Sequence, residues 1–196
     1  FDNGLNSNVR AVRKNTSIGK KVLILLLALF VGAAIGFGYR YYHNVSTHTI
    51  REENFSVELP RSLEKATTID YAAQSSDGTV KANGKYADVN SDFQYMILDY
   101  SSLAGETTDI LTEKLFVTYM KGNLKSQFGS SYKEVYADGN KLKMIYRAKT
   151  GDEVYNYAIC KKSGYKYYWF VFGCKADEKD FYDPKFEKWA STIHIN

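Results

Sequence analysis

The stretch Tyr165-Lys-Tyr-Tyr-Trp-Phe-Val-Phe-Gly-Cys174 is the strongest indication of the fold class, because both of its faces are apolar. Successive side chains of a strand point to opposite faces of the sheet. One face carries Tyr165, Tyr167, Trp169 and Val171, and the other carries Tyr168, Phe170 and Phe172. A strand that is apolar on both faces lies centrally in a sheet that is covered on both sides. The stretch therefore predicts a layered α+β domain, an α/β/α sandwich with a mostly antiparallel sheet.

Strands are also predicted on the amino-terminal side of this stretch. Residues 132–136, 141–148 and 153–160 lead into it as an antiparallel meander, with Asp-Gly, Gly-Asp and Ser-Gly turn signals between the runs. Further upstream, Phe55-Ser-Val-Glu-Leu59 alternates apolar and polar residues before Pro60. We expect other strands at residues 66–74 and 92–101, and a weak one at 85–89.

A long amphipathic helix is predicted over residues 108–128. Its start would be capped by Thr107 or Thr108, and Gly129 is typical of a helix end. Apolar residues recur there at three- and four-residue spacing, which predicts one buried face. That face comprises Leu111, Leu115, Phe116, Tyr119, Met120 and Leu124.

A closing helix follows the meander. Asp183 is expected to cap it and Pro184 to occupy its first turn. The apolar residues are spaced i, i+3, i+4 and i+7, which predicts a face that packs on the sheet. They are Phe186, Trp189, Ala190 and Ile193.

The amino-terminal part contains an uncharged apolar run of 17 residues, 22–38, which is at the short end of what spans a bilayer. A cleaved signal peptide is the alternative to a retained anchor. Aromatic residues and Arg40 follow the run directly, as in an interfacial belt, and this favours the anchor. Five basic residues precede the run, so the positive-inside rule places the amino terminus in the cytoplasm.

The expected organisation has four parts: a basic cytoplasmic segment (1–21), a transmembrane signal-anchor (22–39), a juxtamembrane linker (40–53) and an extracytoplasmic domain (54–196). Gly32 and Gly36 form a Gly-x-x-x-Gly pair, which favours close approach of two such helices and hence a homodimer. Glycine is also common in membrane helices that do not associate.

Charge argues against a nucleic-acid partner. Of 26 basic and 22 acidic residues, the first 21 positions hold five and one, which leaves 21 of each for the rest of the chain. Electrostatic attraction to phosphates dominates nucleic-acid binding, and a neutral domain does not supply it.

The order of elements resembles the PsbP-like superfamily, which includes PsbP, the Ran-binding Mog proteins and bacterial DcrB-type envelope domains. The resemblance rests on the opening Phe55-Ser-Val-Glu-Leu-Pro60 and on the closing Phe186-Glu-Lys-Trp-Ala-Ser-Thr-Ile-His-Ile195. It implies a non-enzymatic sandwich used for binding or assembly. Nothing in the sequence matches photosystem or Ran contacts, so neither of those functions is implied.

The cysteines, histidines and acidic residues could in principle form a catalytic or metal site, but their positions favour structural roles. Cys160 and Cys174 flank one hairpin, where the strand register separates them too far for a disulfide and predicts two buried thiols. No histidine lies in a predicted strand or in the long helix, so a Ser-His-Asp site lacks a base. The acidic loop 177–183 lacks calcium-loop spacing. We therefore expect no metal, cofactor or catalytic residue.

Aromatic residues of the last two strands allow two interpretations. A stacking platform for sugar or peptide is one, and core and ladder packing is the favoured other. The residues concerned are Tyr155, Tyr157, Tyr165, Tyr167, Tyr168 and Trp169.

The sequence thus predicts a membrane-anchored domain of the cell envelope that binds or assembles. A structural subunit of a membrane complex and a hydrolase with an unrecognised carboxylate site are the alternatives. The expected contact is the hairpin tip with Lys161, Lys162, Tyr165 and Lys166, where lysines attract acidic groups and the tyrosine adds contact area. An envelope protein or an anionic envelope polymer would be the partner. A solvated turn is the simpler interpretation of the same tip.

Overall fold

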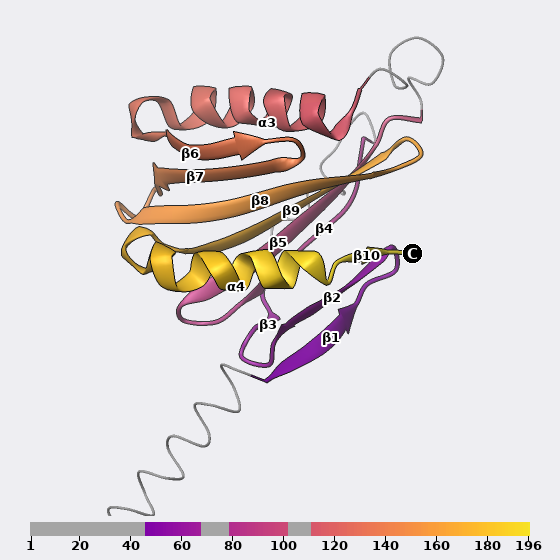
Figure 1. Ribbon diagram of the computed structural model, residues 1–196, viewed down its shortest axis with the longest axis horizontal. Helices are drawn as coiled ribbons and strands as arrows, with labels where there is room; N and C mark the ends of the chain where they lie inside the picture. The colour runs from indigo at the N-terminus through magenta and orange to yellow at the C-terminus, as the bar shows by residue number, and fades with distance from the viewer. Residues whose placement is uncertain (1–45, 68–78, 102–110) are drawn as a thin grey trace, which may run out of the picture. The chain divides into compact units, whose positions relative to one another are not determined.

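The computed structural model describes residues 46–67, 79–101 and 111–196 (Figure 1). The chain divides into two compact units, Phe1–Tyr42 and His43–Asn196. The expected anchor 22–39, with Gly32 and Gly36, lies outside the described residues, as does the basic segment 1–21. In the part of the chain that is described, no helix is long and apolar enough to cross a membrane.

Two sheets and two α-helices make up the described part of the second unit, so the expected α+β class is confirmed. The strands are β1 (Thr47–Arg51), β2 (Phe55–Pro60), β3 (Glu64–Lys65), β4 (Val80–Ala87), β5 (Ser91–Asp99), β6 (Lys133–Asp138), β7 (Lys141–Arg147), β8 (Glu153–Ser163), β9 (Lys166–Lys175) and β10 (His194–Ile195). The helices are α3 (Glu113–Phe128) and α4 (Lys179–Ser191), with short 3-10 helices η2 (Gly129–Ser131) and η3 (Ala176–Glu178).

The larger sheet has seven strands in the order β3-β4-β5-β9-β8-β7-β6, and all its pairings are antiparallel. Strand β9 is the fourth of the seven, as its two apolar faces predicted. The predicted meander of residues 132–174 is confirmed as β6 to β9. Strand β5 pairs with β9 on the side away from β8, with Ser91 opposite Cys174 and Asp99 opposite Lys166.

A smaller sheet has the order β1-β2-β10. The predicted opening strand is confirmed as β2, but the expected linker 40–53 is partly wrong, because Thr47–Arg51 form β1 along the edge of β2. Ile50 of β1 is buried in the core, so the folded unit begins before residue 54. The sequence hid this strand because Ile50 is its only apolar residue.

One face of the large sheet packs against α4 and the small sheet (Figure 1). Phe55 of β2 lies edge-on to Tyr95 and Phe170, with ring centroids 4.8 and 5.0 Å apart. From α4, Phe186 stacks on Phe172 at 5.7 Å. The predicted face of the closing helix is confirmed for Phe186, Trp189 and Ala190, which are buried in α4. Ile193 is also buried, but it follows the helix, which ends at Ser191.

The start of α4 differs from the prediction. The helix begins at Lys179, so Pro184 lies inside it and Asp183 is not its cap. Tyr182 explains why the helix starts earlier than predicted. Its buried ring stacks on Phe186, with ring centroids 5.5 Å apart, and this contact stabilises an additional turn. The Asp183 carboxylate instead accepts a hydrogen bond from the Tyr155 hydroxyl and forms an ion pair with Lys143, 2.9 Å away.

The other face of the large sheet packs against α3, which lies over β7 and β8. Phe116 stacks on Tyr167 at 4.9 Å. Gly129 ends the helix with a φ of 54°, as predicted. The cap at the start of α3 is Thr112, whose side chain accepts a hydrogen bond from the Leu115 backbone amide. The expected start at residues 107–108 lies outside the described residues.

The predicted buried face of α3 is only partly right. Phe116 and Val117 are buried, whereas Leu115 is 46% exposed and Tyr119 is 59% exposed. The apolar residues of α3 occupy a wider arc than one sheet face can cover, so the helix turns some of them to solvent.

Three smaller expectations have mixed outcomes. Of the expected strand 66–74, Ala66 and Thr67 are not in a strand, and residues 68–74 lie outside the described part. The weak strand expected at 85–89 is longer and earlier, as β4. The two thiols are free and buried as predicted, Cys160 on the α3 face and Cys174 on the α4 face.

Candidate functional site

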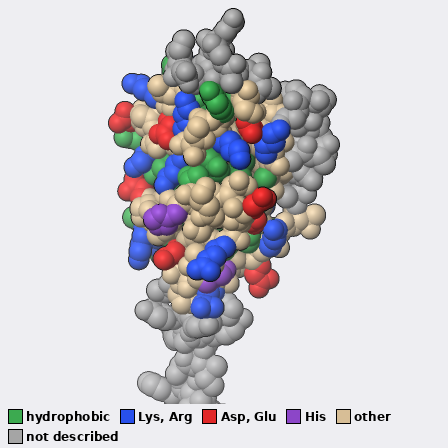
Figure 2. Space-filling model, turned by 90° about the vertical axis from the view of Figure 1, so that its right-hand side faces the viewer, with side chains coloured by type: hydrophobic (Ala, Val, Ile, Leu, Met, Phe, Trp, Pro, Cys, Tyr) green, Lys and Arg blue, Asp and Glu red, His purple; other side chains and the backbone are tan. Residues whose placement is uncertain are grey.

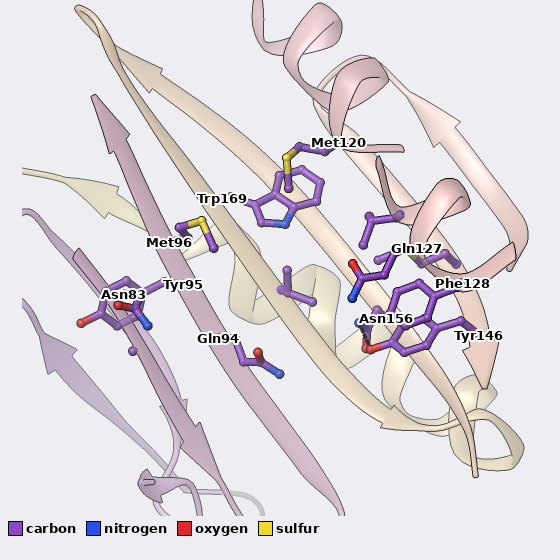
Figure 3. A pocket seen from close by; sticks show the side chains of 14 residues that line it. Asn83, Gln94, Tyr95, Met96, Met120, Gln127, Phe128, Tyr146, Asn156 and Trp169 are labelled. Carbon is purple, nitrogen blue, oxygen red and sulfur yellow. Dashed lines mark hydrogen bonds between the residues drawn. The ribbon is translucent and has the colours of Figure 1, made fainter. Parts of the chain in front are cut away.

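A groove of about 470 Å³ lies beside α3, over the part of the sheet that the helix leaves open (Figure 3). Its residues come from α3 and from five strands, β4, β5, β7, β8 and β9. They are Asn83, Gly84, Gln94, Tyr95, Met96, Met120, Leu124, Gln127, Phe128, Met144, Tyr146, Asn156, Trp169 and Val171. None of these described lining residues carries a charge. The groove therefore fits an uncharged ligand surface.

All three methionines of the chain line this groove. Met96 comes from β5, Met120 from α3 and the buried Met144 from β7. Figure 3 shows the Trp169 indole between Met96 and Met120. Methionine side chains are flexible and polarizable, so such a surface adapts to differently shaped apolar groups.

The other end of the groove is polar and fixed. The Asn156 side chain, 6% exposed, donates a hydrogen bond to the Tyr146 hydroxyl over 3.0 Å. Phe128, the last residue of α3, stacks on the Tyr146 ring at 4.0 Å. Burial raises the pKa of Tyr146, and the bond from Asn156 offsets part of that rise. The hydroxyl therefore stays protonated and acts as a hydrogen-bonding group rather than an acid or base at neutral pH.

Gly173 of β9 leaves room beside this polar end. A Cβ at this position would lie 2.6 Å from an Asp92 oxygen and 2.9 Å from the Asn156 oxygen. Asp92 pairs with Lys85 over 2.7 Å, so its charge is neutralised on the sheet. The glycine allows the carboxylate and the amide to approach each other across the central strand.

The lining of the groove consists of neutral polar, aromatic and apolar residues. Its described lining has no serine, cysteine, histidine or carboxylate, which are the usual nucleophiles and bases. Across the described residues, no group of three or more His, Cys, Asp or Glu side chains is placed to hold a metal ion. The amides and aromatic rings instead supply neutral hydrogen bonds and contact area.

The predicted hairpin tip does not gather its lysines. Lys161 donates to the Ile193 carbonyl at 2.6 Å, and Lys162 donates to the Leu111 carbonyl at 3.1 Å. Ile193 belongs to the α4 face and Leu111 to the α3 face, so the two lysines point to opposite sides of the sheet. Burial lowers the pKa of Lys161. Tyr165 is 40% exposed and Lys166 is half-buried.

Figure 2 views this end of the domain and shows basic and acidic side chains interspersed, without one basic patch. The aromatic cluster is also settled, because Tyr155, Tyr157, Tyr167, Tyr168 and Trp169 are all buried. Core packing, the favoured interpretation, is confirmed for these five residues. Sequence reasoning missed the groove, since its residues come from six elements with no common spacing. The only available signal was three methionines in an aromatic-rich chain.

No family model matches the chain, and no curated protein matches it. Among solved structures, cyanobacterial PsbP from Synechocystis is similar over 77% of this chain and 93% of its own, with 15% identity and a TM-score of 0.47. The Ran-binding protein Mog1p of Saccharomyces cerevisiae is similar over 76% and 95%, with 9% identity and a TM-score of 0.45. Protein PA94 of Pseudomonas aeruginosa is similar over 72% and 92%, with 10% identity and a TM-score of 0.41.

PsbP and the Mog proteins are two of the groups that the sequence resembles. The solved structures that are similar to this chain include members of these two groups. These identities assign no residue role to this chain.

Proposed function

We propose that this chain is a membrane-anchored, non-enzymatic binding domain of the cell envelope, which holds an extended, uncharged segment of a partner protein in the groove beside α3. The observation that carries the proposal is the groove itself. It brings together every methionine of the chain, a tryptophan and four amide side chains, without a charged residue among its described lining.

A peptide segment suits this lining better than other uncharged ligands. The lining contains the amides of Asn83, Gln94, Gln127 and Asn156, a side-chain type that can both donate and accept hydrogen bonds, as an extended peptide backbone does. The methionines and Trp169 provide an adaptable apolar wall for alternate side chains. A volume of about 470 Å³ accommodates a few residues rather than a whole helix.

The location of the domain is proposed from the sequence. The apolar run after a basic segment supports an anchor with the amino terminus in the cytoplasm, which places the folded domain outside. Gly32 and Gly36 support association of two anchors. An envelope protein is then the expected partner. An anionic polymer is less favoured, because Lys161 and Lys162 already donate to backbone carbonyls.

A displayed library of random short peptides tests the proposal. The wild-type protein should enrich uncharged peptides rich in apolar residues. Met120→Arg should abolish the enrichment, because the variant puts a bulky charge into the groove. Tyr119→Arg is the matched control, since the neighbouring Tyr119 side chain is 59% exposed on the outer side of α3. Equal enrichment by the wild type and Met120→Arg would exclude the groove as the binding site.

A further inference from the structure

One end of the folded domain combines the entry of the chain with protruding apolar side chains. The described chain begins at Ser46, whose carbonyl accepts the Arg61 amide at 3.0 Å. In the next turn, the Ser62 hydroxyl donates to Asp88 at 2.7 Å. That bond joins the turn after β2 to the turn between β4 and β5. We call this region the entry end, defined by Arg61, Val89, Phe181 and Lys185.

Val89 is the most exposed large apolar residue of the described chain, at 91%. It lies at the tip of the turn between β4 and β5. Asp88 holds this turn, since one of its oxygens accepts the Asn90 and Ser91 amides at 2.8 and 2.7 Å. The exposure of Val89 therefore follows from a fixed turn and not from a frayed end.

The start of α4 lies against the same turn. Tyr182 is buried there. Burial is the main cause of its raised pKa, and the nearby Asp88 raises the pKa further while Ser91 lowers it. The neighbouring Phe181 is 61% exposed, and the Lys185 ammonium lies 3.4 Å from its ring centroid. Figure 1 shows the start of β1, the turn between β4 and β5, and the start of α4 along one side of the domain.

We propose that the entry end rests on the lipid bilayer, with Val89 and Phe181 in the headgroup region and Arg61 and Lys185 beside lipid phosphates. This inference rests on the proposed membrane anchor. Seven residues, 40–46, separate the anchor 22–39 from Thr47. Seven extended residues span at most about 25 Å, so the entry end stays close to the surface.

The chemistry of this end fits a lipid surface better than a charged protein patch. Exposed apolar side chains beside cations are typical of surfaces that contact the membrane–water interface. The apolar side chains are buried among the lipids there, while the cations stay beside the lipid phosphates. Glu64 and Asp180 are also exposed at this end, and Asp180 pairs with Lys179 at 3.1 Å, so the net positive charge of these side chains is small. The contact should therefore depend on apolar burial and change little with salt. Tethering makes even weak contacts effective, because the local concentration is high.

The test uses the full chain reconstituted in vesicles of phosphatidylcholine with phosphatidylglycerol. Single variants Val89→Cys and Phe181→Cys carry a polarity-sensitive dye, and lipids brominated near the headgroup act as quenchers. Tyr165→Cys is the control, because Tyr165 directly precedes β9, at the end of that strand opposite to Cys174, and is 40% exposed. Cys160 and Cys174 are buried, and burial raises the pKa of both thiols, so they do not compete for the dye.

We expect dyes at 89 and 181 to shift to shorter wavelength and to be quenched at least twofold more than the dye at 165. Added salt should not reverse the difference. A chain that sediments with the vesicles but shows equal quenching at all three positions would overturn the inference and leave the anchor intact. A chain that does not sediment with the vesicles would overturn both.

Discussion

Asn156 on β8 donates a hydrogen bond to the hydroxyl of Tyr146 on β7 across 3.0 Å, and this bond closes the polar end of the groove. Phe128 of α3 stacks on the same tyrosine, so the end of the helix is fixed to the sheet at this point. One hydrogen bond and one ring contact therefore connect β8, β7 and α3 at this end of the groove.

Tyr146→Phe removes the hydroxyl that accepts the hydrogen bond from Asn156. The buried Asn156 amide then has lost this hydrogen-bond partner. A buried polar group that loses its partner costs about 1–3 kcal/mol, so the free energy of unfolding should fall by that amount. Tyr136→Phe is the control, because Tyr136 is exposed and its hydroxyl makes only a long 3.4 Å contact with Asp138. Urea unfolding measures both variants, and equal losses would show that the buried bond does not matter.

Gly173→Ala tests the close approach across the central strand. The added Cβ would meet Asp92 and Asn156 at less than 3.0 Å, so both side chains must move. Overpacking of this kind typically costs about 1–3 kcal/mol. Gly122→Ala is the control, since a Cβ at Gly122 meets nothing within 4 Å. Alanine there should stabilise α3 by about 1 kcal/mol. Opposite signs in thermal unfolding are the expected result, and a stable Gly173→Ala would contradict the packing described.

Trp189→Ala tests how α4 is attached to the sheet. Trp189 is 6% exposed and contacts Phe172 and Phe186, with ring centroids 6.2 and 5.5 Å away. Truncating such a side chain should lower the free energy of unfolding by about 3–5 kcal/mol. Lys188→Ala, one residue earlier on the exposed side, should be nearly silent. Similar melting temperatures for the two variants would refute the buried face of α4.

Alkaline pH should destabilise the domain through its buried tyrosines. Burial is the main reason that the pKa values of Tyr95, Tyr157 and Tyr182 rise to about 12. The unfolded chain has tyrosines of ordinary pKa, about 10. A folded pKa above the unfolded one gives stability that is complete below about pH 10 and is lost as pH rises through the folded value.

Chemical unfolding at increasing pH measures this loss, with phenolate absorbance as a second signal. The free energy of unfolding should decline once unfolded tyrosine starts to ionise. A flat profile through that range would show that these hydroxyls reach water in the folded state.

The spacing of apolar residues predicted the central strand and the buried face of the closing helix. In each case the buried side chains follow the regular repeat of a single strand or helix. Trp169 and Phe170 are buried on opposite faces of β9, and Phe186 and Trp189 on one face of α4, as that period requires. Strand β1 was missed, since pairing with β2 and not its own composition makes it a strand.

The groove could not be predicted in the same way. Met96, Met120 and Met144 become neighbours of one cavity only through the strand order that inserts β9 between β5 and β8. The orientation of α3 was equally hidden, because Leu115 and Phe116 are both apolar and only the packed sheet decides which is buried. Lys161 and Lys162 donate on opposite sides of the sheet because adjacent residues of a strand point to opposite faces.

Methyl NMR of the full chain with isotope-labelled methionine tests directly whether the groove beside α3 binds a peptide. Met96, Met120 and Met144 each report on the groove, and single Met→Leu variants assign their signals. Titration with a peptide selected on the wild-type protein should shift all three signals together, and Met120→Arg should abolish that binding while Tyr119→Arg retains it. A peptide that binds while all three methyl signals stay unchanged would exclude the groove as the peptide site.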